Sequence, residues 1–203
     1  MEAEQIKTLL LRISAGDEEA FKQLFNHYYP KLIQLALAFV PGIVAAQEVV
    51  SDLFYKILKN PIILKNVNDF DNYIFLAVKN QSYTYLKKNK NRLIFDSIDQ
   101  KEDYIISNFK NPENSLISDE LFQLVKKVVQ KLPPKRKAVY QLIKEEGKKY
   151  KEVADILGIS VKTVELQMSL ALKVLRKSVR EYQESKDIKI RRLGRTNFFS
   201  VIF

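Results

Sequence analysis

The chain has 203 residues and is 46% hydrophobic, so it is long enough for one ordinary domain or two small ones and too apolar for general disorder. It has no cysteine and one histidine, His27, which excludes disulfides and thiolate zinc sites and argues against a histidine metal site or catalytic triad. The net charge of +10 suits a polyanionic partner, although charge alone does not identify one.

Only five glycines and six prolines are available for turns, which favours helices over a sheet. A signal peptide begins with positively charged residues, whereas Glu2 and Glu4 are acidic, so we expect no signal peptide. The longest apolar stretch, Leu32 to Val40, is too short to span a bilayer. We therefore expect an all-α protein of the cytoplasm, without membrane insertion and with no metal or cofactor.

The first half of the chain predicts three or four helices. Asp17 can cap a helix with an apolar face spaced at three and four residues, formed by Ala20, Phe21, Leu24, Phe25 and Tyr28. Pro30 is expected to end or bend that helix. A second apolar helix, Leu32 to Val40, is expected before the break at Pro41-Gly42.

Two more helices are predicted before the middle of the chain. One runs from about Val44 to Leu58, and the other from about Phe70 to Lys88, where a basic cluster begins. Between them, residues 59–69 contain several asparagines and a proline and are typical of a loop. Residues 93–115 are locally acidic and lack a sustained period, so we expect an interdomain linker there.

The second half is predicted to be helical again. An apolar stripe ends at Leu132, Pro133-Pro134 starts the next helix, and Gly147 ends it as a left-handed cap. The segment Tyr150 to Val164 then has the pattern of a helix-turn-helix. Small Ala154 allows two helices to cross closely, Gly158 permits a positive φ in the turn, and Ser160 can cap the second helix.

The second helix of such a unit commonly lies in the major groove of DNA. Its outward residues include groups that can bind base edges or phosphates. They are Lys162, Thr163, Glu165, Leu166, Gln167, Ser169, Leu170 and Lys173. Flanking charges at Lys148, Lys149, Lys151, Arg176 and Lys177 would add electrostatic attraction. The alternative is a helical hairpin that binds nothing.

Three stretches together resemble the extracytoplasmic-function (ECF) sigma factors, over residues 5–180. Ala46 to Leu58 (AQEVVSDLFYKIL) is similar to the family's polymerase-binding helix. Phe70 to Asn80 (FDNYIFLAVKN), continuing to Lys88, is similar to the helix that melts and binds the minus-ten promoter element. The helix-turn-helix is similar to the domain that binds the minus-thirty-five element.

The resemblance implies two small helical domains: residues 1–92, which bind polymerase and the minus-ten element, and residues 116–182, which bind the minus-thirty-five element. Residues 93–115 would link them, either within the polymerase or as a simple tether. The implied partners are core RNA polymerase, promoter DNA and an anti-sigma factor, and the implied role is not enzymatic. The resemblance assigns polymerase binding to Glu48, Asp52, Phe54 and Lys56, and minus-ten DNA to Lys79, Asn80, Tyr83, Lys87 and Lys88.

The sequence departs from the family pattern at several of these positions. Lys149 stands where Ser or Thr usually caps a helix, Thr84 where Asp is common, and Glu165 and Gln167 where basic residues are frequent. We therefore expect an altered preference for the upstream promoter element.

Two rival functions and one segment stay open on the sequence alone. A conventional helix-turn-helix regulator would more often be a dimer on a palindrome. A nucleic-acid enzyme would need a metal at carboxylates such as Asp69 and Asp71, which more commonly serve as helix caps. The tail, residues 183–203, either docks on this protein or an anti-sigma partner, or is a frayed, aggregation-prone terminus.

Overall fold

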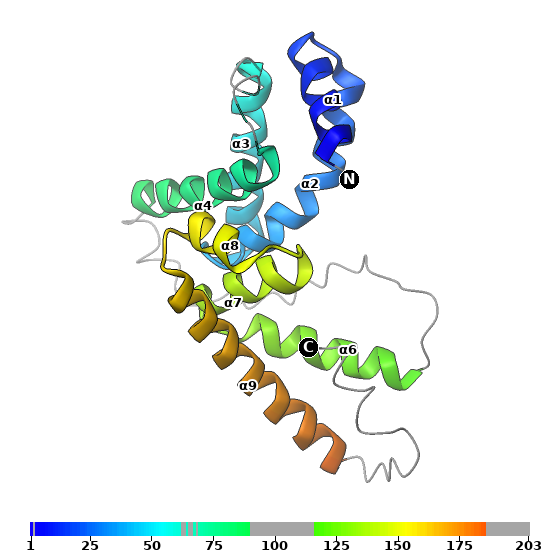
Figure 1. The fold of residues 1–203 in the computed structure, drawn as a ribbon, viewed down its shortest axis with the longest axis vertical. Coiled ribbons are helices and arrows are strands. Elements are labelled where there is room, and N and C mark those ends of the chain that lie inside the picture. Colours follow the sequence, from blue (N-terminus) through cyan, green and yellow to red (C-terminus); the bar gives the residue numbers. More distant parts are fainter. Residues whose placement is uncertain (2, 62–63, 65–66, 68, 90–115, 186–203) are drawn as a thin grey trace.

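The computed structural model describes the chain except residues 2, 62–63, 65–66, 68, 90–115 and 186–203 (Figure 1). The expected linker and nearly all of the expected tail therefore lie outside the described residues. The described part is helical and contains no strand. Its elements are α1 (Ala3–Ser14), α2 (Glu18–Ala36), α3 (Gly42–Lys59), α4 (Phe70–Lys88), α6 (Leu116–Gln130), α7 (Pro134–Tyr140), the π-helix η2 (Gln141–Glu145), α8 (Tyr150–Leu157) and α9 (Val161–Ser185).

Helix α1 was not among the predicted elements. Its buried residues are spaced at three and four positions and face α2: Ile6, Leu9, Leu10 and Ile13. This spacing is an ordinary amphipathic signal, and it would have sufficed to predict the helix. The predicted cap of the next helix is confirmed, because the Asp17 carboxylate accepts a hydrogen bond of 3.0 Å from the Ala20 backbone N–H.

Helix α2 runs through Pro30, so the prediction of two separate helices in residues 17–40 was wrong. Proline removes one backbone donor from a helix interior, but the residues after it still have an apolar face to bury. Leu32, Ile33 and Leu35 are at most 2% exposed, and their burial keeps the chain helical beyond the proline.

Helices α3 and α4 agree with the predicted segments and complete the N-terminal half. Helix α4 begins where the Asp69 carboxylate accepts a hydrogen bond of 2.9 Å from the Asn72 backbone N–H. Both helices pack against α2 and against each other. The aromatic rings of Phe21, Phe25 and Phe54 meet in this core, and so do those of Tyr28 and Phe70.

The C-terminal half is built around the long helix α9, which packs against α6, α7 and α8. The predicted left-handed glycines are confirmed, since Gly147 and Gly158 both have φ of +67°. The helix that starts at Pro134 passes into a π-helical turn before it ends. Helix α9 continues three residues past the expected domain boundary at Tyr182.

The two halves lie against each other (Figure 1). Helix α8 packs on α4, and η2 contacts α2, so the buried apolar residues of both halves form one continuous cluster. In the part of the chain that the structure describes, no helix is both long enough and apolar enough to cross a membrane.

Candidate nucleic-acid interface

The helix-turn-helix has the predicted local geometry. Gly158 adopts the left-handed conformation directly after α8, which redirects the chain within three residues. The Ser160 hydroxyl oxygen then accepts a hydrogen bond of 3.1 Å from the Thr163 backbone N–H, so the predicted cap of α9 is confirmed. Ala154 is 5% exposed and Val164 is fully buried, so the two helices cross in close contact.

One stripe of α9 faces solvent. Its exposed residues are Lys162, Glu165, Leu166, Ser169 and Lys173, which are separated by three or four positions. Leu166 is 56% exposed, so its side chain is free to contact a thymine methyl group. This stripe carries side chains that can bind base edges and phosphates.

Three of the predicted DNA-binding residues of α9 flank this stripe and are half-buried: Thr163, Gln167 and Leu170. The Thr163 hydroxyl lies 2.8 Å from the Ser160 hydroxyl, and the Gln167 carbonyl accepts a hydrogen bond of 3.4 Å from Arg136. Arg136 on α7 therefore holds the Gln167 amide in one orientation. On the inner face, Ala171 is buried, whereas Val161 at the start of α9 is 39% exposed.

The lysines before α8 differ in what they can contact. Lys149 and Lys151 are exposed, as DNA-contacting lysines should be. Lys149 cannot cap α8 with its side chain, but its backbone N–H donates a 2.7 Å hydrogen bond to the Glu152 carboxylate. Lys148 is only 8% exposed, so the expectation that it attracts DNA was wrong for this arrangement of the chain.

The five residues expected to bind minus-ten DNA lie along α4. Asn80, Tyr83, Lys87 and Lys88 are exposed, and the Tyr83 ring lies 5.7 Å from that of Phe39. Lys79 instead points toward the turn of the helix-turn-helix, because its Nζ lies 3.7 Å from the position a Cβ would take on Gly158. Burial at this contact lowers the pKa of Lys79.

The four residues expected to bind polymerase lie on α3 and differ in exposure. Glu48, Asp52 and Lys56 are exposed. Gln81 of α4 links two of them, since its amide accepts a 2.6 Å hydrogen bond from Lys56 and donates one of 3.3 Å to Asp52. Phe54 is 2% exposed and packs between helices, with its ring 4.8 Å from that of Phe25. Its side chain therefore fixes the position of α3 and does not reach the surface.

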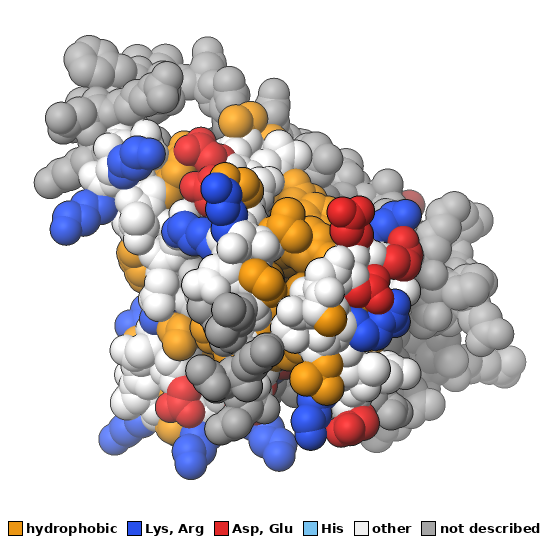
Figure 2. Space-filling model, turned by 90° about the horizontal axis from the view of Figure 1, so that it is seen from above, with side chains coloured by type: hydrophobic (Ala, Val, Ile, Leu, Met, Phe, Trp, Pro, Cys, Tyr) orange, Lys and Arg blue, Asp and Glu red, His pale blue; other side chains and the backbone are white. Residues whose placement is uncertain are grey.

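Exposed apolar side chains accompany the charges of α3. Tyr55 and Leu58 are more than half exposed on α3, and so is Leu11 on α1. Figure 2 views the molecule from the end at which α1 and α3 lie, and apolar side chains gather there between charged groups. An apolar patch with a charged rim is typical of a protein-binding surface.

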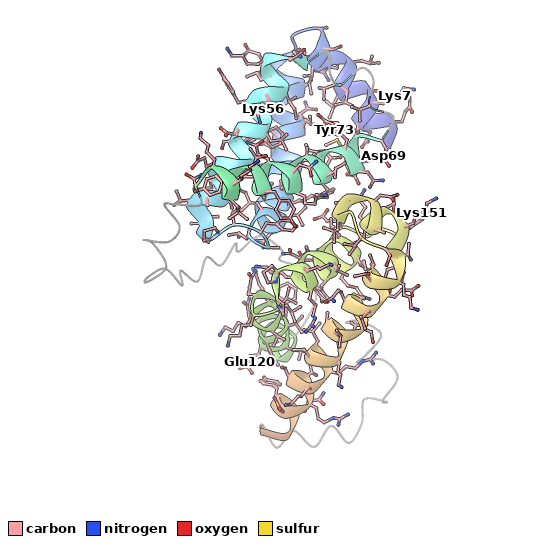
Figure 3. All side chains as sticks on the ribbon, turned by 90° about the vertical axis from the view of Figure 1, so that its left-hand side faces the viewer. Lys7, Lys56, Asp69, Tyr73, Glu120 and Lys151 are labelled. Carbon is pink, nitrogen blue, oxygen red and sulfur yellow. The ribbon has the colours of Figure 1, made fainter. Side chains whose placement is uncertain are left out.

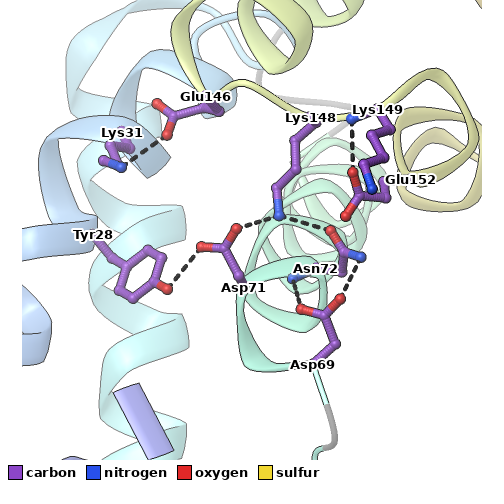
Figure 4. A network of polar contacts seen from close by, with 9 residues as sticks. All are labelled: Tyr28, Lys31, Asp69, Asp71, Asn72, Glu146, Lys148, Lys149 and Glu152. Atoms are coloured by element: carbon purple, nitrogen blue, oxygen red, sulfur yellow. Dashed lines mark hydrogen bonds and ion pairs between the residues drawn. The ribbon is translucent and has the colours of Figure 1, made fainter. Parts of the chain in front are cut away.

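Lys148 joins the two halves of the molecule (Figure 4). Its Nζ forms an ion pair with the Asp71 carboxylate, donates a 2.8 Å hydrogen bond to the Asn72 side chain, and lies 5.6 Å from the centre of the Phe75 ring. The same carboxylate accepts a 2.8 Å hydrogen bond from the Tyr28 hydroxyl. A buried ammonium group is thus paired with a carboxylate and further hydrogen-bonded, as its desolvation requires.

Charge effects at this contact are consistent with the geometry. Burial acts to raise the pKa of Asp71, but the hydrogen bonds from Lys148 and Tyr28 outweigh it and hold the pKa below its usual value. Burial and the neighbouring Asp71 charge raise the pKa of Tyr28. A second ion pair, 2.9 Å long, joins Lys31 to Glu146. Figure 3 shows α8, with Lys151, beside the start of α4.

Asp71 was considered above as a helix cap or a metal ligand, and its bond to Lys148 was missed. Asp69 is the cap, and Asp71 is the interdomain acceptor. No group of His, Cys, Asp or Glu that could hold a metal ion occurs among the residues that the structure describes.

Comparisons with known proteins agree with this geometry. Residues 122–175 match the family described as sigma-70, region 4. The ECF RNA polymerase sigma-E factor of Escherichia coli K12 is 26% identical over 164 residues, which cover 78% of this chain and 85% of that protein. The RNA polymerase sigma-H factor of Pseudomonas aeruginosa is 23% identical over 182 residues, covering 87% and 94%.

Two solved structures have the same fold. The sigma factor RpoE of Bartonella quintana, solved with the anti-sigma factor NepR, has a TM-score of 0.60 at 20% identity and covers 79% of this chain and 96% of its own. CnrH, solved with the cytosolic domain of CnrY, has a TM-score of 0.54 at 22% identity and covers 87% and 98%.

Two helical halves, the second a region 4 helix-turn-helix, define the sigma-70 class of transcription factors. The similarity to curated relatives extends across both halves and not only over the helix-turn-helix. The chain therefore resembles the ECF group of RNA polymerase sigma factors.

Proposed function

We propose that this protein binds core RNA polymerase and directs it to promoters through their minus-ten and minus-thirty-five elements. The observation that carries the proposal is the exposed polar stripe of α9, set on a confirmed helix-turn-helix and preceded by a second helical domain that matches sigma factors. The polymerase catalyses RNA synthesis, and this chain supplies specificity.

The two domains divide this work. Residues 1–92 bind polymerase and the minus-ten element, residues 116–182 bind the minus-thirty-five element, and residues 93–115 connect them. In α9, Glu165 can accept a hydrogen bond from a cytosine amino group, and Gln167 can pair with adenine. Lys162 and Lys173 lie on the same exposed stripe and suit flanking phosphates.

In α4, Asn80 and Tyr83 are the residues proposed to hold unstacked bases of the minus-ten element. Both are exposed on one side of the helix, with the basic residues Lys87 and Lys88 following toward its end. A tyrosine ring can stack on a base that leaves the duplex, while lysines neutralise the backbone. Asn80→Ala should reduce promoter opening, measured by permanganate footprinting of the holoenzyme, and normal opening would remove this assignment.

The polymerase-binding surface is proposed to centre on Asp52, Glu48 and Lys56, with the exposed apolar residues of α3 beside them. Asp52→Lys should weaken binding to core polymerase in a pull-down and leave the binding of isolated minus-thirty-five DNA unchanged. Glu19→Lys is the matched control, because Glu19 is an exposed carboxylate on a different helix. Equal loss in both variants would indicate a general charge effect instead.

An anti-sigma factor is a further proposed partner. The two structural neighbours were both solved in complexes, one with the anti-sigma factor NepR and the other with the cytosolic domain of CnrY. The shared fold is consistent with a comparable inhibitor for this chain.

Run-off transcription tests the function as a whole. Purified chain added to core polymerase should start transcription from a subset of a promoter library, and core polymerase alone should not. A conventional regulator would bind DNA without enabling core polymerase to initiate, and that result would overturn the proposal.

A further inference from the structure

A groove of about 570 Å³ lies between α6 and the C-terminal half of α9, away from the stripe proposed to bind DNA. Its walls are mainly apolar and include Leu124 and Val128 from α6, Leu132 from the turn after it, and Val174, Ser178 and Tyr182 from α9. Val174 is 37% exposed, so the groove presents apolar surface that the described residues leave uncovered.

We propose that the C-terminal end of the same chain, residues 198–203, occupies this groove. The segment reads Phe-Phe-Ser-Val-Ile-Phe, so five of its six residues are apolar and three are phenylalanines. Such a segment has a large apolar area to remove from water. The groove offers an apolar surface on α9, the helix that precedes this segment in the chain.

The length of the chain fits this docking. Val174 precedes the end of α9 at Ser185 by eleven residues, which is about 17 Å at 1.5 Å per helical residue. Residues 186–197 provide twelve residues between α9 and Phe198. A flexible chain of twelve residues has a root-mean-square span of about 17–21 Å, so the segment can return along α9 without being fully extended.

A tether of matching length also makes weak binding sufficient. A short flexible linker gives an effective concentration on the order of millimolar. A segment with an intrinsic dissociation constant of about 1 mM would therefore occupy the groove about half the time. The connecting residues include the basic residues Lys186, Lys189, Arg191, Arg192 and Arg195. The acidic residues Glu120 and Glu181 lie near the end of α9.

The experiment uses a single tryptophan, because the natural chain has none. In the full-length Phe199→Trp protein, the emission should be blue-shifted and should resist quenching by acrylamide several-fold better than free tryptophan. Adding Val174→Asp should return both properties to those of an exposed side chain. Val161→Asp is the matched control, since Val161 is also a valine of α9, is 39% exposed, and lies outside the groove.

A tryptophan that is exposed in the first protein would overturn the proposal. Protection that persists with Val174→Asp would place the segment elsewhere, and protection that grows with protein concentration would assign the groove to a second copy. The absence of natural cysteines allows a second readout that does not depend on the aspartate variant. Val174→Cys with Ile202→Cys should form an intramolecular disulfide on mild oxidation, and Val161→Cys with Ile202→Cys should not.

Discussion

Lys148 and Lys149 are adjacent lysines, but one is buried in an ion pair and the other is exposed to solvent. Lys149 is exposed and available to a phosphate, whereas Lys148 is 8% exposed and pairs with Asp71 across the two halves. Composition around the helix-turn-helix could not separate the two lysines, because the distinction depends on a carboxylate 77 positions away. A lysine this deeply buried needs such a partner to offset its lost hydration.

Lys148→Met should therefore destabilise the contact between the halves. The substitution keeps most of the side-chain volume but leaves Asp71 without its cation. Because the Asp71 side chain is 37% exposed, water partly replaces the lost bond, and we expect a loss of about 1.5–3 kcal/mol in urea unfolding. Lys151→Met, an exposed lysine of α8, should change stability by less than about 0.5 kcal/mol. Equal effects would refute a special role for Lys148.

Gly158→Ala should destabilise the helix-turn-helix for a reason that concerns backbone conformation alone. At φ of +67° a Cβ costs about 1 kcal/mol or slightly more, whereas the nearest atom, Lys79 Nζ at 3.7 Å, leaves ordinary room for it. Thermal unfolding should show this loss, and Gly158→Asn should lose less, because asparagine tolerates the left-handed region better. A larger loss for asparagine would point to crowding instead.

At the scale of helices, the sequence predicted α3, α4 and the helix-turn-helix closely, because each has clear boundary residues and one apolar face. The same approach split α2 at Pro30, since local propensity favours a break there and only tertiary burial of Leu32 and Leu35 keeps the helix continuous. The expectation of an all-α fold is confirmed for the described residues.

Pro30→Ala should consequently stabilise the protein. A proline inside a helix costs about 3 kcal/mol relative to alanine. Alanine also makes the unfolded state more flexible, which lowers the gain in stability by up to about 1 kcal/mol. We expect a net increase of about 1–2 kcal/mol in the free energy of unfolding, because α2 has already adapted to the proline. Pro41→Ala provides the contrast: Pro41 precedes α3 in an extended conformation that suits proline, so this change should give no gain.

At the scale of the whole molecule, the pairing of the two halves could not be predicted. The exposed stripe of α9 follows from periodicity within one helix, but the contact of α8 with α4 depends on how distant surfaces meet. Sequence patterns show that α4 has polar residues at its start, and they do not show which of these caps the helix and which bonds across to Lys148.

The interdomain contact should weaken in acid. The pKa of Asp71 is lowered when the halves are in contact, so its contribution is fully present above the usual aspartate value of about 3.9 and is lost as pH falls through the lowered value. Lys148, Tyr28 and Lys31 are the groups that act on this carboxylate. Energy transfer between dyes on Ser51→Cys and Lys177→Cys should fall as the pH drops below the usual aspartate value. The Asp71→Asn variant has no carboxylate at this position, so the part of the fall in energy transfer that comes from Asp71 should be absent.

The position of α8 on α4 would make DNA binding at Lys79 compete with the contact between the two halves. Lys79, which the family resemblance assigned to minus-ten DNA, faces the turn after α8. A ligand that needs this side of α4 binds only molecules whose halves have separated, and its apparent dissociation constant is the intrinsic one divided by the separated fraction. Loss of the positive charge at Lys148 should therefore strengthen binding to single-stranded minus-ten DNA, which is the reverse of what removing a phosphate-contacting lysine would do.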